Sequence, residues 1–385
     1  MTRAIPPVLP VSGHAAAADR VAALDGVRGL AILLVVVMHS TLFGCRLPGV
    51  EPLGDDHVLV SLALLGWCGV DVFFVLSGFL ITGILLRSKE QPHYFRNFYA
   101  RRALRIFPLY YAVIVLLLFV LPRAPTTTAE KLSYLLYYQN LSFAFVGPDP
   151  DLARLVTWSL AIEEQFYLVW PAIVFFASRR ALVVLCAIAI AVAWTLRFVA
   201  VAQGFEHTHF VTPCRMDALA AGALLALVPL PSRWFGGFLT LLGAASLVAI
   251  AFTIGNPLPE DMSMQRWGLL GALSLAVGVL VLARGAGASS RLFSTRVLRS
   301  LGQYSYCIYL THLLVIQLIA WWIDRPQMSD ARAWVAANCP GPLVLGCFTI
   351  GCLLAAWLVG LVSWHLFEKH FLACKRFFGG TAAKA

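Results

Sequence analysis

Charged residues are scarce in this sequence. Asp, Glu, Lys and Arg together make up 12% of its 385 residues, whereas a soluble domain carries roughly 25%. Apolar residues make up 60%, and the mean hydropathy is +0.81. These values exclude a water-soluble enzyme, a disordered tail protein and a disulfide-linked secreted module. They predict an integral membrane protein whose main surroundings are membrane lipid.

Metal-binding spacings are missing as well. No Cys-x-x-Cys pair and no His-x-x-x-His pair occurs, so we predict no metal site. Most of the nine cysteines lie within apolar runs and are interpreted as small core residues. Acidic residues are also few, 19 against 29 basic ones. In a membrane protein this excess is typical of cytoplasmic loops, and we expect no nucleic-acid partner.

Apolar runs long enough to cross about 30 Å of hydrocarbon predict ten helices. They start near Val27, Val58, Leu104, Val156, Ala181, Phe210, Trp234, Trp267, Leu301 and Leu343. Basic residues concentrate in alternate loops, on the side of the N-terminus, which makes that side cytoplasmic. We therefore predict an all-α integral membrane protein, a single bundle of about ten transmembrane helices with both termini cytoplasmic. Residues 1–21 are expected to form a flexible cytoplasmic tail, residues 22–372 the transmembrane domain and residues 373–385 a short cytoplasmic tail.

Ionisable side chains inside the predicted spans need a partner, a water-filled cavity or a function, because a charge in hydrocarbon costs several kcal/mol. His39 follows Arg28 by eleven residues, which puts it about 16 Å above the inner surface at 1.5 Å per residue. Glu163 and Glu164 enter from the outer end of an inward-running span and should reach a similar depth. Adjacent helical residues point about 100° apart, so we expect only one carboxylate to face the polar centre.

Arg215, Asp217 and His312 share this outer half of the bilayer, with Asp71 somewhat deeper. Tyr304 and Tyr309 precede His312 on a span that runs outward from the inner face. Two histidines at matching depth beside buried acids favour a functional site. A buried structural pair and a functional role fit Arg215 and Asp217 equally well, and a structural role is favoured for Asp71.

Three arginines mark the predicted inner end of the third span. Arg101 and Arg105 are four residues apart and should share one helix face, with Arg102 turned away. Two guanidinium groups on one face suit a bidentate grip on phosphates. Arginines at this place are also typical of any cytoplasmic helix end, and the same two interpretations apply to Arg28.

Seven motifs, in order along residues 22–372, resemble those of the acyltransferase-3 family, integral-membrane O-acyltransferases that modify extracytoplasmic glycans and some natural products. The first is LDGVRGLAILLVVVMHS, in which Arg28 and His39 have the Arg-x10-His spacing of the family. The others are GVDVFFVLSGFLIT, FYARRALRIFPLYY, TWSLAIEEQFYLVWP, CRMDALAAGALLA, LGQYSYCIYLTHLLV and SWHLFEKHF.

The resemblance implies an acyl-CoA donor, in particular acetyl-CoA, that arrives from the cytoplasm. It implies a catalytic role for His39 and important roles for Arg28, the Arg101/Arg105 region and the Glu163 region. The expected acceptor is a hydroxyl of an extracytoplasmic or membrane-linked glycan, such as lipopolysaccharide or exopolysaccharide, at a bacterial inner membrane. Some members carry an additional esterase-like domain. This sequence is expected to be a stand-alone member, with a separate periplasmic partner as an open option.

His39 could act as a general base or as a nucleophile, with Glu163 or Glu164 orienting it. The alternative function is a proton-coupled transporter of a small solute or acyl group, with His39, Glu163 and His312 as a relay. No internal repeat is visible in the sequence, which disfavours a transporter built from inverted repeats.

Overall fold

The computed structural model describes residues 14–47, 58–122, 124–254, 264–285 and 287–378. All regular elements in these ranges are helices, and nine helices or helix runs in them are long and apolar enough to cross a membrane. The prediction of an all-α, multi-pass membrane protein is therefore confirmed. The nine segments are Ala22–Gly44, Val58–Ser88, Tyr94–Val120, Leu152–Phe176, Arg179–Ala202, Arg233–Thr253, Met264–Arg284, Arg296–Ile323 and Gly341–Phe378.

The sixth predicted span differs from the others. Helix α10 (Thr212–Leu227) has 16 residues, so it is about 24 Å long, shorter than about 30 Å of hydrocarbon. It is buried between α9 (Arg179–Ala202) and α3 (Gly69–Ser88). A Cβ atom on Gly78 or Gly222 would lie 1.9 Å from a backbone oxygen of the facing helix. These two glycines therefore allow α3 and α10 to pack backbone against backbone.

Two other predicted boundaries need correction. The second predicted span is divided into α2 (Val58–Leu64), the short η1 (Leu65–Cys68) and α3. The third begins earlier than predicted, because α4 (Tyr94–Val115) starts at Tyr94. Its three arginines therefore lie two to three turns inside the helix instead of at its end, where side chains of neighbouring helices can reach them.

Helices α1 (His14–Gly44) and α14 (Arg296–Ile323) form the central pair of the bundle. A Cβ atom on Gly29 would lie 1.9 Å from the Leu298 oxygen, and one on Gly302 would lie 1.8 Å from the Asp25 oxygen. Ten residues further along both helices, His39 meets His312. The two helices therefore run parallel and in register, and they carry arginines at one end and histidines further along.

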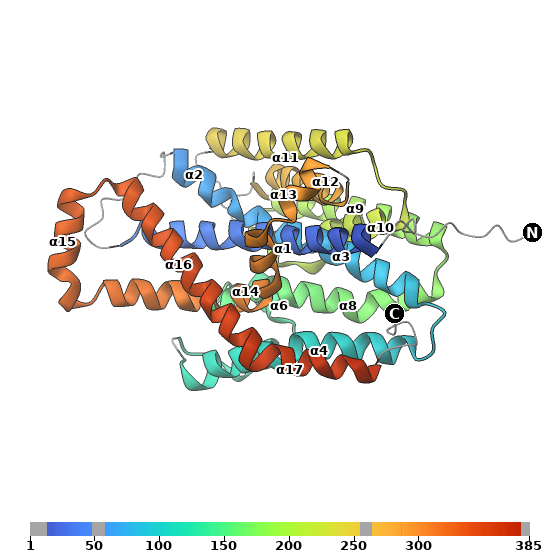
Figure 1. The fold of residues 1–385 in the computed structure, drawn as a ribbon, viewed down its shortest axis with the longest axis horizontal. Coiled ribbons are helices and arrows are strands. Elements are labelled where there is room, and N and C mark those ends of the chain that lie inside the picture. The colour runs from blue at the N-terminus through green and yellow to red at the C-terminus, as the bar shows by residue number, and fades with distance from the viewer. Residues whose placement is uncertain (1–13, 48–57, 123, 255–263, 286, 379–385) are drawn as a thin grey trace, which may run out of the picture.

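The remaining helices surround this pair (Figure 1). Helices α11 and α12 pack together, α4 and α17 lie at the opposite edge in this view, and α15 connects the far ends of α14 and α16. Their bounds are α5 (Thr128–Leu135), α6 (Gln139–Phe145), α7 (Leu152–Leu155), α8 (Trp158–Phe176), α11 (Arg233–Ile254), α12 (Leu269–Arg284), α13 (Ala288–Phe293), α15 (Ser329–Asn338), α16 (Gly341–Ser363) and α17 (Lys369–Ala373). Short or irregular turns are η2 (Leu116–Val120), η3 (Thr208–Phe210), η4 (Met264–Gly268), η5 (Pro326–Met328), η6 (Trp364–Glu368) and η7 (Cys374–Phe378).

The two predicted tails fall partly outside the described residues. In the described residues, α1 begins at His14 and η7 continues to Phe378. Parts of both predicted tails are therefore helical. The start of α1 and the end of α17 lie toward the same end of the bundle (Figure 1). Since the described residues hold nine candidate spans, the predicted ten crossings stay a prediction. The assignment of that end to the cytoplasm stays a prediction.

Candidate active site

A pair of histidines joins α1 to α14. Nδ1 of His39 lies 3.2 Å from Nε2 of His312. His312 is fully buried, whereas His39 is only partly buried. The sequence predicted that the two rings lie at the same depth, and the structure brings them into direct contact.

The carbonyl groups around these rings assign the tautomers. Nδ1 of His312 lies 2.8 Å from the Tyr309 oxygen, and Nδ1 of His39 lies 2.9 Å from the Val35 oxygen. A carbonyl oxygen only accepts, so both Nδ1 atoms carry the proton when the rings are neutral. Nε2 of His312 can then accept from His39, and Nε2 of His39 keeps its lone pair. His39 is therefore arranged to accept a proton or to attack an electrophile.

His39 lines an outer cavity of about 170 Å³. The cavity is lined mainly by apolar and aromatic side chains, and polar groups reach it from several elements besides α1. The lining includes Arg46, Trp67, Trp158, His209, Arg215 and Tyr309. His209 is buried, and its ring contacts that of Phe210 at a tilt of 47°, with 3.9 Å between the ring centres. The sequence analysis did not single out His209, although its place in GFEHTHF, beside the predicted start of a span, was a possible signal.

Arg215 is the buried cation of the outer cavity. It donates from Nη2 to Oδ1 of Asp71 at 2.9 Å, and both side chains are 2% exposed. Its guanidinium group also faces the rings of Phe74 and Trp158. Among the described residues, Nε and Nη1 of Arg215 have no hydrogen-bond partner. Two donors therefore remain for a group that enters the cavity.

The sequence analysis considered a buried pair of Asp217 with Arg215, but the two side chains do not pair. Asp217 accepts from Arg197 of α9 at 2.7 Å, and Arg197 also donates to the Cys214 oxygen at 2.5 Å. Residues two apart on a helix point to opposite sides, so Arg215 reaches α3 while Asp217 reaches α9. Two crossed ion pairs thus fix α10 between its neighbours. The role of Arg197 was missed because its partner depends on how α9 packs.

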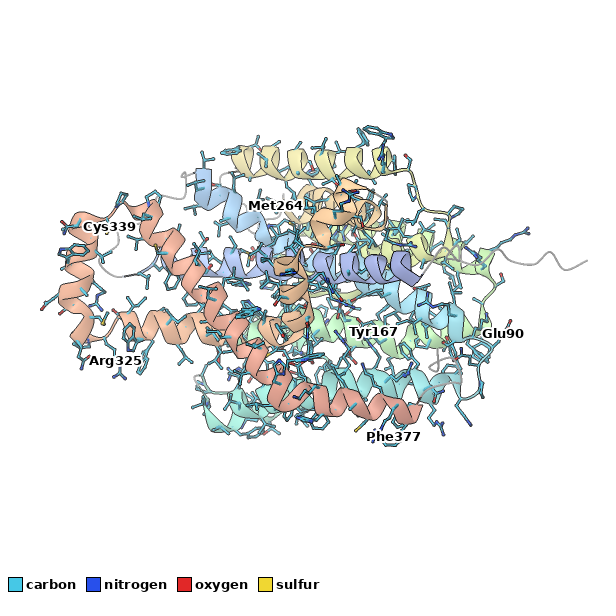
Figure 2. The ribbon with its side chains drawn as sticks, in the orientation of Figure 1. Glu90, Tyr167, Met264, Arg325, Cys339 and Phe377 are labelled. Carbon is cyan, nitrogen blue, oxygen red and sulfur yellow. The ribbon has the colours of Figure 1, made fainter. Side chains whose placement is uncertain are left out.

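An inner cavity of about 100 Å³ lies on the arginine side of the outer cavity. Ser77 donates to Oε1 of Glu163 at 2.6 Å, and Tyr167 donates to Ser77 at 3.1 Å. Arg102 lies over the Tyr167 ring, 4.1 Å from its centre. Figure 2 shows Tyr167 in the middle of the molecule, between the opposite ends marked by Glu90 and Arg325. Ser77 and Tyr167 were not predicted, because a hydroxyl group in an apolar run gives no distinct signal.

Only one of the two adjacent glutamates lines the inner cavity, as predicted. That residue is Glu163. Oε1 of Glu164 is buried, and within the described part of the chain it has no hydrogen-bond partner. The hypothesis that a glutamate orients His39 needs correction, because the side chain in contact with His39 is His312.

The arginines of α4 are arranged differently from the prediction. Arg102 and Arg105 line the inner cavity together with Arg28, because residues three apart share a helix face. Arg101 is exposed and lines a separate surface cavity, which Arg102 and Arg105 also reach. The prediction that Arg102 turns away from the other two is wrong.

Tyr309 separates the two cavities. With Val70 it lines both of them. Its hydroxyl donates to the Val156 oxygen at 2.9 Å and lies 2.5 Å from Oγ of Ser159. Tyr304 is not part of this cluster, because it packs against Trp357 and Trp364.

The described residues contain no group of three or more His, Cys, Asp or Glu side chains placed to hold a metal ion. All nine cysteines lie in the described ranges, and no disulfide joins any of them there. The candidate site therefore consists of imidazole, guanidinium, carboxylate and hydroxyl groups around two adjoining cavities.

Comparison with known proteins gives the family. A family model described as an acyltransferase domain matches residues 21–361. The chain is 30% identical over 343 residues to the peptidoglycan O-acetyltransferase OatA of Listeria monocytogenes. This alignment covers 81% of this chain and 52% of the relative. The chain is also 30% identical over 327 residues to the putative peptidoglycan O-acetyltransferase YrhL of Bacillus subtilis, covering 77% of this chain and 48% of the relative. With the O-acetyltransferase OatA of Staphylococcus aureus, strain NCTC 8325, it shares 26% identity over 331 residues, or 77% of this chain and 50% of the relative.

The chain thus spans about half the length of these curated relatives. No solved structure shows a significant match to it. The family model nevertheless covers most of the chain, from the first turns of the described α1 into α16. The chain belongs to the acyltransferase-3 family.

Proposed function

We propose that this protein is a membrane O-acetyltransferase that moves an acetyl group from cytoplasmic acetyl-CoA to a glycan hydroxyl outside a bacterial inner membrane. The observation that carries the proposal is a pair of cavities of different chemistry that meet at Tyr309 and Val70. The inner cavity has three arginines, and the outer cavity has the accessible histidine and one buried arginine. A donor from one side and an acceptor from the other would meet at this wall.

The donor would enter at the arginine end. Arg28 and Arg105 would bind its phosphates, since guanidinium groups form strong charge-assisted hydrogen bonds with phosphate oxygens. The pantetheine arm would pass Arg102, Ser77 and Glu163 and would bring the thioester carbonyl to Tyr309.

His39 would then promote the transfer. Acting as a base, Nε2 of His39 would take the proton of the acceptor hydroxyl while the oxygen attacks the thioester carbonyl. The carbon–sulfur bond would break, and the departing thiolate would receive that proton. Acting as a nucleophile, Nε2 would first carry the acetyl group itself and release the thiolate before the hydroxyl attacks. The free donors of Arg215 would stabilise the negative oxygen of the tetrahedral intermediate in either case.

The acceptor is proposed to be a cell-envelope glycan. Two relatives are named for peptidoglycan, so peptidoglycan is the first acceptor to test for this chain. Outer aromatic side chains such as Trp67 and Trp158, which line the outer cavity, would provide flat apolar surfaces for sugar rings.

The test uses the full chain in lipid nanodiscs with radiolabelled acetyl-CoA and peptidoglycan fragments. We expect release of free thiol and label in the glycan for the natural protein, and neither for His39→Gln. His370→Gln, at an exposed position of α17, is the matched control and should be fully active. In sealed proteoliposomes, label that crosses the membrane while still attached to CoA, without release of thiol, would refute the transferase and support the transporter.

The two chemical routes can be separated in the same preparation. Rapid quenching after donor addition without acceptor should leave acetylated His39 only if His39 is the nucleophile. In cells, deletion of the gene should remove O-acetyl groups from one envelope glycan, which would also identify the acceptor.

A further inference from the structure

A third cavity, of about 420 Å³, lies beside the inner cavity, at the end of the molecule that we propose to be cytoplasmic. We call it the arginine cavity. Its lining includes four arginines, Arg28, Arg105, Arg296 and Arg299, together with Trp364. Arg28 and Arg105 also line the inner cavity, so the two cavities share a wall made of guanidinium groups.

Most of the positive charge of this cavity has no ion-pair partner among the described residues, although the Glu368 carboxylate is near enough to Arg105 to attract it. The acidic residue in its lining is Asp25, which pairs with Arg28 at 2.7 Å. In the described ranges, Arg105, Arg296 and Arg299 make no ion pair. Arg296 and Arg299 also occupy the first turn of α14, where the helix dipole disfavours positive side chains. An arrangement that is electrostatically unfavourable when empty would be stabilised by a bound polyanion.

We propose that the arginine cavity binds the nucleotide part of the acyl-CoA donor, with Arg296 and Arg299 as ligands of its 3′-phosphate. The diphosphate adjoins the pantetheine arm, so it belongs at the shared Arg28 and Arg105. The 3′-phosphate is on the ribose, further from the thioester, so it belongs at the rim of the cavity, where Arg296 and Arg299 are exposed. This inference rests on the proposed function, because it assigns a site to that donor.

The helix pair α1 and α14 joins this site to the two histidines. Arg28 and His39 are eleven residues apart on α1, and Arg299 and His312 are thirteen residues apart on α14. At 1.5 Å per residue these distances are about 16 Å and 20 Å. A long molecule with a charged head and a thin arm matches these distances. Trp364, which is partly exposed and lines the cavity, would stack on the adenine base.

Phosphate groups of anionic lipids have the same chemistry and could occupy the same arginines. We assign the nucleotide because the arginine cavity adjoins the inner cavity, with which it shares Arg28 and Arg105 as lining residues. A lipid headgroup site would give no reason for these shared residues.

The test compares binding of CoA and 3′-dephospho-CoA to the full chain by isothermal titration. The protein is held in nanodiscs of phosphatidylcholine. The natural protein should bind CoA at least tenfold more tightly than 3′-dephospho-CoA. In the double variant Arg296→Gln, Arg299→Gln that preference should disappear, while affinity for 3′-dephospho-CoA stays unchanged and shows that the variant is folded. The control is Arg180→Gln, Arg291→Gln, which removes the same charge from two exposed arginines outside the lining of the three cavities.

A preference for CoA that persists in the Arg296→Gln, Arg299→Gln variant would overturn this inference and leave the donor itself intact. An equal loss of the preference for CoA in the Arg180→Gln, Arg291→Gln control would show that net charge causes the effect, and it would also overturn this inference. Phosphatidylglycerol would be the ligand of the pair if it abolishes CoA binding to the natural protein and this competition is lost in the Arg296→Gln, Arg299→Gln variant. That result would assign the two arginines to lipid instead. Failure of the natural protein to bind either nucleotide would refute the donor proposed above, and this inference with it.

Discussion

Replacing His312 by Leu tests whether His312 only supports His39 or is itself catalytic. Leu removes the acceptor that lies 3.2 Å from Nδ1 of His39, but the Val35 oxygen stays 2.9 Å from that atom. The His39 tautomer is therefore retained, and one neutral hydrogen bond is lost, at a net cost of about 0.5 to 1.5 kcal/mol. If that cost appears only in the transition state, kcat falls about two- to tenfold. A general base would instead account for about 10²- to 10⁴-fold.

The assay is thiol release from acetyl-CoA in the presence of acceptor, with kcat and KM measured separately. His39→Gln should be inactive, His312→Leu should lose up to about tenfold in kcat with KM unchanged, and His312→Gln should recover part of the loss because its amide oxygen can accept. Thermal unfolding in detergent checks that each variant is folded, since His312 is fully buried. A folded His312→Leu variant as inactive as His39→Gln would refute the assignment of the base to His39 alone.

Three further predictions concern the inner half of the molecule. Arg105→Ala should raise KM for acetyl-CoA by about tenfold, the cost of one lost bidentate contact with the donor phosphates, while exposed Arg101→Ala should change it little; titration of the donor checks this, and the reverse order would return the donor site to the Arg101 face. Glu163→Gln should slow acetyl transfer more than Glu164→Gln, because only Glu163 lines the inner cavity; equal rates in steady-state assays would contradict that role. Gly302→Ala should destabilise the folded protein and lower activity, because its Cβ would lie 1.8 Å from the Asp25 oxygen; an unchanged unfolding temperature would show that the α1–α14 contact is looser than described.

The sequence by itself predicted the class of fold and the depth of the polar residues. Scarce charge and long apolar runs require a helical membrane protein, because backbone groups in lipid must be satisfied within each segment. Depth follows from a constant rise per residue, so His39 and His312 could be assigned to one layer before their contact was seen. The length of α10 was mispredicted, because its burial against α3 and α9 allows a helix too short to cross the bilayer alone.

Tertiary structure alone decided which of these residues meet. The direction of a side chain around its helix matters only once neighbouring helices have packed, and the sequence carries no direct record of that packing. The partners of Arg215 and Asp217 therefore lie on two other helices, and Arg102, predicted to turn away, lies against Tyr167. The contact of His39 with His312 depends on the register of α1 and α14, which the close backbone approach at Gly302 determines.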